Sequence, residues 1–178
     1  MNKKIILSSI LLSIGSLTSI AAVADTDYSS ATITWSGISS VIPGSKVVIT
    51  GENGAITPNK GELDVRYDGV FSTATPVVLE SRTYDDKTGA VGDMMQTTWT
   101  LSKDPIKVNW GKNATAGMDV KVKDINTGTE LKNGEGVASV STVSLSVENS
   151  NKLANAPVDP NAVLSVQANV LATVVDPA

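Results

Sequence analysis

The feature that most constrains the fold of this chain is a series of short runs in which apolar and polar residues alternate, separated by Gly, Pro, Asn and Asp. Such alternation is typical of β-strands with one packed and one solvated face, and the separating residues are typical of turns. No stretch has an apolar period of 3.6 residues long enough for a helix. The pattern therefore predicts an all-β protein, an antiparallel sandwich or barrel. About nine strands are predicted, near Ala31–Gly37, Lys46–Thr50, Glu62–Tyr67, Val77–Thr83, Met94–Leu101, Ile106–Trp110, Met118–Lys123, Val137–Val147 and Ala162–Val175.

The first 24 residues have the pattern of a secretory signal peptide. Lys3 and Lys4 precede an apolar stretch, and Ala22-Val23-Ala24 has the small residues of a cleavage site. We expect a mature protein that begins at Asp25, contains about 154 residues and forms a single domain after export.

Charge and composition make several function classes improbable. The 14 basic residues include Lys3 and Lys4, so the mature part has 12 basic against 18 acidic residues, and an acidic protein is poorly suited to nucleic acid. The chain has no Cys and no His, so it lacks the usual nucleophile pairs, the usual general base and the soft metal ligands. We expect no enzyme, no metal and no cofactor.

The last predicted strand is the longest alternating run. Its apolar face carries Leu164, Val166, Ala168, Val170, Ala172 and Val174. An exposed edge of this length would attract another chain, so the strand requires a neighbour. Two arrangements remain open: the N-terminal run around Trp35 pairs with this strand in the same molecule, or it inserts into the sheet of another subunit.

The chain resembles the subunits of chaperone–usher pili, and within them the major pilin of the enterobacterial common pilus. Four segments carry the resemblance: Ala31-Thr32-Ile33-Thr34-Trp35-Ser36, Ser45-Lys46-Val47-Val48-Ile49-Thr50, Lys60-Gly61-Glu62-Leu63-Asp64-Val65 and Ser72-Thr73-Ala74-Thr75. The final alternating strand, which ends near the C-terminus, adds to it. The chain departs from type 1-like pilins because it has no cysteine pair and no aromatic residue near its end.

The resemblance implies an immunoglobulin-like sandwich that lacks one strand and is completed by a donor strand from a neighbouring subunit. Residues 25–36 would be the donor extension and 37–178 the pilin domain. By resemblance, the donor side chains are Tyr28, Ala31, Ile33 and Trp35, and the acceptor groove is lined by Leu164, Val166, Ala168, Val170 and Val174.

The same resemblance implies a homopolymer of like subunits, assembled by a periplasmic chaperone and an outer-membrane usher into a cell-surface fimbrium that supports adhesion. A receptor on a host surface is a further partner. The main alternative is a self-contained, secreted β-sandwich that acts as an adhesin or a carbohydrate-binding module, with Trp35, Trp99 and Trp110 as a sugar-stacking platform. Core packing is the commoner role of a tryptophan on an alternating strand.

Two chemical sites are less favoured. Asp85, Asp86 and Asp93 could chelate Ca²⁺, but their spacing does not match a twelve-residue calcium loop, so a solvated hairpin is preferred. A glycosidase would need paired carboxylates, which Glu52, Glu62, Asp64, Asp68 and Glu80 could supply, although an ordinary solvated sheet face explains them as well.

Overall fold

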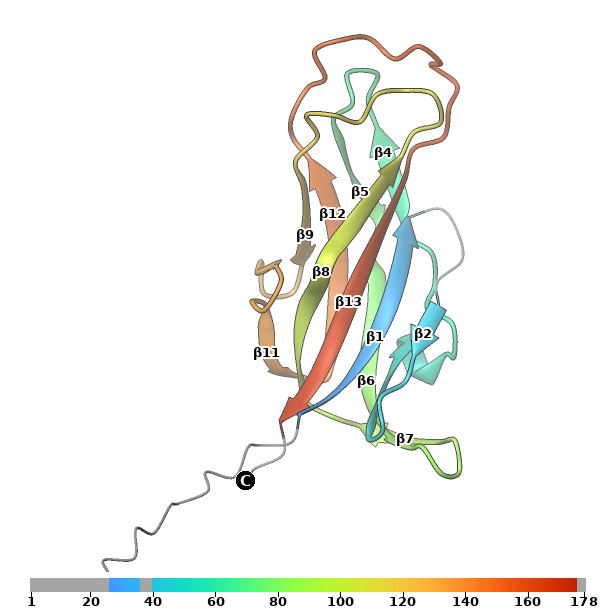
Figure 1. The fold of residues 1–178 in the computed structure, drawn as a ribbon, viewed down its shortest axis with the longest axis vertical. Helices are drawn as coiled ribbons and strands as arrows, with labels where there is room; N and C mark the ends of the chain where they lie inside the picture. The colour runs from blue at the N-terminus through green and yellow to red at the C-terminus, as the bar shows by residue number, and fades with distance from the viewer. Residues whose placement is uncertain (1–25, 36–39, 176–178) are drawn as a thin grey trace, which may run out of the picture.

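The computed structural model describes residues 26–35 and 40–175, and within these ranges the chain forms β-strands and one short 3-10 turn, η1 (Glu52–Gly54), with no α-helix (Figure 1). The all-β prediction is confirmed. The strands are β1 (Thr26–Trp35), β2 (Ser40–Ile42), β3 (Val47–Gly51), β4 (Glu62–Val65), β5 (Phe71–Thr75), β6 (Val77–Asp85), β7 (Ala90–Met94), β8 (Thr97–Asn109), β9 (Val120–Asp124), β10 (Glu130–Leu131), β11 (Val137–Val140), β12 (Thr142–Asn149) and β13 (Ser165–Val175). The predicted signal peptide at 1–24 lies outside the described residues, as do Asp25 and Ser36.

The strands form two antiparallel sheets. One has five strands in the order β11-β8-β13-β1-β2. The other has the path β10-β9-β12-β5-β4, and β6 joins it by pairing with β12, β3 and β7. In the first sheet, the first and last strands of the chain are therefore neighbours (Figure 1).

One hydrophobic core lies between the two sheets. The five-stranded sheet contributes Trp99, Leu101 and Val166, and the other sheet contributes Leu79 and Leu145, all at most 2% exposed. Alternate residues of each strand face this core because successive side chains of a strand point to opposite faces. The expectation that one side of each sheet is packed is thus confirmed for these strands.

Turn residues end the strands where the sequence predicts turns. Asn53 and Gly54 have φ angles of 57° and 73°, and Gly69 and Gly89 also have positive φ. The predicted acidic hairpin is formed by β6 and β7, and the Asp85 carboxylate accepts hydrogen bonds from the backbone N–H groups of Lys87 and Thr88. This aspartate therefore stabilises the turn.

Strand β1 begins five residues before the predicted start at Ala31, the short strands β2 and β10 are not predicted, and two longer predicted segments divide differently in the structure. The predicted strands Met94–Leu101 and Ile106–Trp110 are one strand, β8, in which the register against β13 shifts between Leu101 and Ile106. Pro105 cannot donate a ladder hydrogen bond and Asp104 has a φ of 53°, so this bulge looks like a turn in the sequence.

The second difference is the predicted strand Val137–Val147, which is divided into β11 and β12 in different sheets. Val140 and Val143, on either side of Ser141, are three residues apart, so the alternation changes phase at the point where the two strands divide, although no Gly or Pro marks it. Strand β5 was not predicted, because its sequence Phe-Ser-Thr-Ala-Thr has little apolar alternation.

Candidate functional site: the groove that holds the first strand

Strand β1 fills a position inside the five-stranded sheet. It pairs antiparallel with β13 from Thr26 opposite Val175 to Trp35 opposite Val166, and with β2 from Ser30 opposite Ile42 to Thr32 opposite Ser40. Without β1, one side of β13 would have no strand beside it over this whole length. We call the space between β13 and β2 that β1 occupies the groove.

The predicted acceptor residues lie on the core side of β13. Leu164 precedes the strand and is 5% exposed, Val166, Ala168 and Val170 are fully buried, and Val174 is half-buried. Ala172, which continues the same row, is also fully buried. The row is continuous, so it forms one apolar wall of the groove.

The register brings three of the four predicted donor residues opposite this wall. Ala31 pairs with Val170, Ile33 with Ala168 and Trp35 with Val166. Tyr28 pairs with Thr173, which is out of phase with the buried row. Tyr28 is five positions from Ile33 and seven from Trp35, and residues an odd number of positions apart in a strand belong to opposite phases, so this register does not place Tyr28 in the same row as Ile33 and Trp35.

Trp35 closes one end of the strand. Its side chain is fully buried, and its backbone makes a parallel bridge with Gly61. A Cβ atom on Gly61 would collide with Cδ1 and Nε1 of the Trp35 indole, and would lie 2.9 Å from the carbonyl oxygen of Thr75. Gly61 thus provides the space that the Trp35 indole needs, a role that no local signal in the sequence indicates.

The three tryptophans differ in their hydrogen bonding. Nε1 of Trp99 donates to the carbonyl oxygen of Val140 at 3.0 Å, and Nε1 of Trp110 donates to that of Ala162 at 2.9 Å. Nε1 of Trp35 is buried and has no hydrogen-bond partner among the described residues. All three indoles are at most 4% exposed, so they do not form an exposed sugar-stacking platform, and the core-packing interpretation is confirmed.

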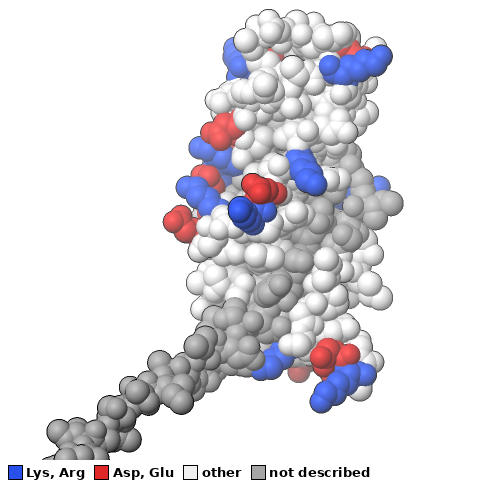
Figure 2. Space-filling model, viewed as in Figure 1, with Lys and Arg blue, Asp and Glu red and all other residues white. Residues whose placement is uncertain are grey.

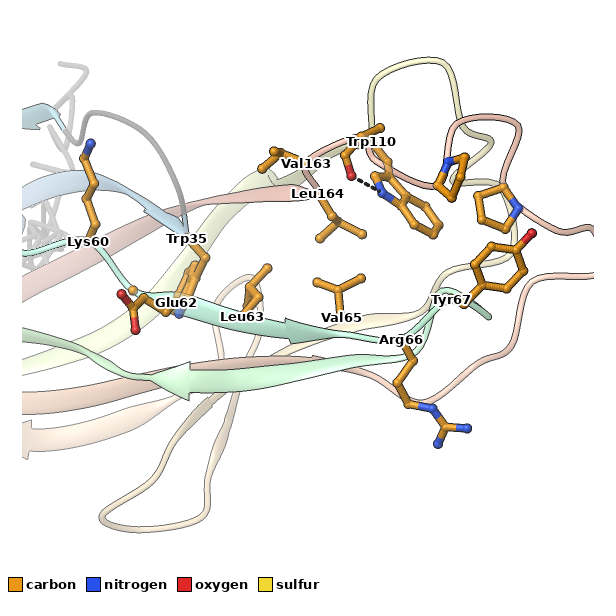
Figure 3. Close-up of a pocket in the computed structure, with 14 residues that line it drawn as sticks. Trp35, Lys60, Glu62, Leu63, Val65, Arg66, Tyr67, Trp110, Val163 and Leu164 are labelled. Carbon is orange, nitrogen blue, oxygen red and sulfur yellow. Dashed lines mark hydrogen bonds between the residues drawn. The ribbon is translucent and has the colours of Figure 1, made fainter.

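Beyond Trp35, a cleft remains open at the same end of the groove. Its volume is about 710 Å³, and it lies between β4 with the residues that follow it and the segment before β13. Figure 3 shows Leu63 and Val65 of β4 pointing toward Leu164, with Trp110 and Tyr67 farther from Trp35. Its lining also includes Trp35 itself, Lys60, Gly61, Glu62, Arg66, Pro157, Pro160, Ala162 and Val163.

The carboxylates considered for catalysis are mostly engaged in local contacts. Glu80 is 6% exposed and accepts hydrogen bonds from Arg82 and from the backbone N–H groups of Asn53 and Gly54. Burial raises the pKa of Glu80, but these hydrogen bonds and the Arg82 charge outweigh it and hold the pKa below its usual value. Glu62 accepts a hydrogen bond from Thr75. Glu80 therefore fixes the β3–η1 region to β6.

Charge on the visible face of the five-stranded sheet is mixed. Figure 2 shows basic and acidic side chains interspersed there, without a continuous field of one sign among the described residues. No group of three or more metal-ligating side chains occurs in ranges 26–35 and 40–175. The same ranges contain no helix of the length and hydropathy needed to cross a membrane.

Comparison with known proteins finds no relative of this chain. No protein-family model matches the chain, and neither the search of curated proteins nor the search of solved structures finds a similar protein. The groove and the cleft must therefore be interpreted from their own residues.

Proposed function

We propose that the chain is the structural subunit of a surface fimbria and that it polymerises by donor-strand exchange. In the polymer, residues 26–35 of one copy occupy the groove of the next copy, which completes an immunoglobulin-like sandwich. The observation that carries the proposal is the position of β1, a terminal segment that fills a place inside the sheet between β13 and β2.

Exchange between copies preserves every contact of the groove. The strand that fills it has the same sequence whether it comes from the same chain or from another copy, so Ile33 and Trp35 meet Ala168 and Val166 in both cases. Only the connection differs. Within one chain, residues 36–39 must return the backbone from Trp35 to β2, whereas between copies they lead to a separate body.

The joint has enough interaction energy to be long-lived. Ten residue pairs link β1 to β13, and burial of a large apolar side chain such as that of Trp35 contributes about 1.5 to 3 kcal/mol in addition to the net contribution of the ladder hydrogen bonds. Separation would expose Val166, Ala168 and Val170 to water. A filled groove therefore dissociates slowly.

An empty groove requires protection before assembly. Its wall of buried apolar residues and the unpaired side of β13 would attract other chains. A periplasmic chaperone that lends a strand, followed by an outer-membrane usher that orders the exchange, would meet this need. The proposal accordingly includes export through the periplasm, a homopolymer, an adhesive role and no catalytic step.

The test moves the donor strand to the other end of the chain. Because Thr26 lies opposite Val175, a second copy of residues 26–35, joined after Ala178 by a short turn, would pair with β13 in the observed register. We expect the exported full chain to form heat-resistant polymers and the variant with the appended copy to remain monomeric, as measured by light scattering and gel electrophoresis without boiling.

The matched control carries aspartate in place of both Ile33 and Trp35 in the appended copy alone. This copy cannot bury its side chains, so polymers should return. If the full chain instead remains a monomer at every concentration and after unfolding and refolding, the donor-strand proposal fails. The self-contained binding module would then replace it.

A further inference from the structure

The cleft beyond Trp35 stays open although β1 is in place. Tyr67 is 61% exposed and Val163 is 75% exposed, on opposite walls of the cleft, and Val65 between them is 40% exposed. The strand in the groove therefore does not cover these side chains. A cluster of exposed apolar residues beside a hollow of this size marks a surface at which another molecule binds.

The chain connectivity indicates which molecule lies there, if the proposed strand exchange is correct. The donor chain leaves the groove at Trp35, and only residues 36–39 separate Trp35 from Ser40 at the start of β2. Five backbone steps span at most about 18 Å, so the body of the donor copy must begin within this distance of the cleft.

Exposed apolar side chains occur on β2 and on the segments that share a hollow with it. Ile42 is 67% exposed, Ile56 is 87% exposed and Val91 is 47% exposed. Ile56 and Val91 line a hollow of about 250 Å³ together with Val41 and Pro43. We call the three exposed residues Ile42, Ile56 and Val91 the β2 patch. Ile42 follows Ser40 by two residues, so it must lie within about 25 Å of the Trp35 that the same chain has inserted.

We propose that the cleft lined by Tyr67 and Val163 is the docking surface for the β2 patch of the next copy of this chain. The subunit joint then has two parts, the inserted strand and a contact between the two bodies. The cleft and the β2 patch are different surfaces, so the contact is head-to-tail and repeats without closing. The second part restricts rotation about the four-residue connection.

The chain has no cysteine, so single engineered cysteines report on this contact directly. We would introduce Val163→Cys and Tyr67→Cys separately into the full chain and measure the rate of maleimide labelling in the monomer and in the polymer. The control is Asn126→Cys, in the exposed turn between β9 and β10 on the edge of the sheet opposite β4.

We expect both cleft cysteines to react at least ten times more slowly in the polymer than in the monomer, while the rate at position 126 stays within a factor of two. Polymers in which both cleft cysteines react as fast as in the monomer would overturn the docking proposal but leave strand exchange intact. Failure of the full chain to polymerise at all would overturn both.

A second measurement tests whether the slower labelling in the polymer is caused by the body of the neighbouring copy or by residues 36–39. Copies with Val163→Cys are mixed with copies with Ile42→Cys during polymerisation and treated with a short bismaleimide. We expect covalent dimers of the two copies, because the two positions face each other across the joint. If protection occurs without such dimers, the body contact is refuted.

Discussion

Trp35 is the residue of β1 whose surroundings are most closely fitted to it, and its side chain is fully buried at the end of the groove. Its indole packs against Gly61, where the missing side chain leaves room for the ring. Unlike Trp99 and Trp110, it makes no hydrogen bond through Nε1 within the described residues. A buried unpaired N–H group costs about 1 to 3 kcal/mol, so the indole of this tryptophan is held by packing, while its backbone pairs with Val166 and Gly61.

The first prediction concerns Gly61. Gly61→Ala should destabilise the monomer by about 1 to 3 kcal/mol, because the added Cβ overpacks the site against the indole. Urea unfolding monitored by circular dichroism measures the change. In a Trp35→Ala background the same substitution should cost less, since the collision with the ring is gone and only the 2.9 Å approach of the added Cβ to the Thr75 carbonyl oxygen remains. Equal losses in the two backgrounds would contradict the proposed contact.

The second prediction concerns acid stability. Because the pKa of Glu80 is lower in the folded than in the unfolded protein, its contribution to stability is present above the unfolded value and is lost as pH falls through the folded value. Glu80→Gln should therefore be less stable near neutral pH and should flatten the loss of stability below about pH 4.5. Thermal unfolding between pH 7 and pH 3 tests this.

The matched control for Glu80 is Asp86→Asn, which alters a carboxylate in the exposed turn between β6 and β7. It should leave the difference in melting temperature between pH 7 and pH 3 unchanged. If Glu80→Gln also retains the full acid dependence of the wild-type chain, the carboxylate does not provide the acid-sensitive link between η1 and β6.

At the scale of whole elements, β13 is predicted well from the sequence because its pattern is local. Leu164, Val166, Ala168 and Val170 are recognisable as one buried row from their spacing alone. The role of Gly61 and the cleft are not predictable in this way. They depend on segments about a hundred residues apart, such as Val65 and Val163, that only the folded sheets bring together.

Strand β13 supplies the third prediction. Ala168 is fully buried opposite Ile33, whereas the neighbouring Gln167 is exposed. Ala168→Asp would bury a charge without a partner and should cost about 3 kcal/mol or more, with loss of both monomer stability and polymer yield. Gln167→Glu should change stability by no more than about 0.5 kcal/mol. Similar losses of stability for the two variants would show that Ala168 does not belong to the buried wall of the groove.

At the scale of the whole molecule, the proposed polymer would bring the cleft of one copy near the β2 patch of the next, because only residues 36–39 separate Trp35 from β2. Trp35 at the end of β1 lines the cleft, and Ile42 of the β2 patch follows Trp35 by seven residues in the chain. In the proposed polymer, residues 36–39 would be the only covalent link between an inserted strand and its own body. Docking of the two surfaces would make the polymer stiff as well as durable.

The fourth prediction separates stiffness from durability. Val163 is 75% exposed and lies outside β13, so Val163→Asp should leave the stability of the monomer within about 0.5 kcal/mol of the wild-type value. The polymer should keep its heat resistance, because the groove is unchanged. Its persistence length in electron micrographs should fall at least twofold, because the charge opposes docking of the β2 patch. Asn126→Asp, on the opposite edge, should have no such effect. Unaltered stiffness of the Val163→Asp polymer would mean that the connection alone sets the geometry of the joint.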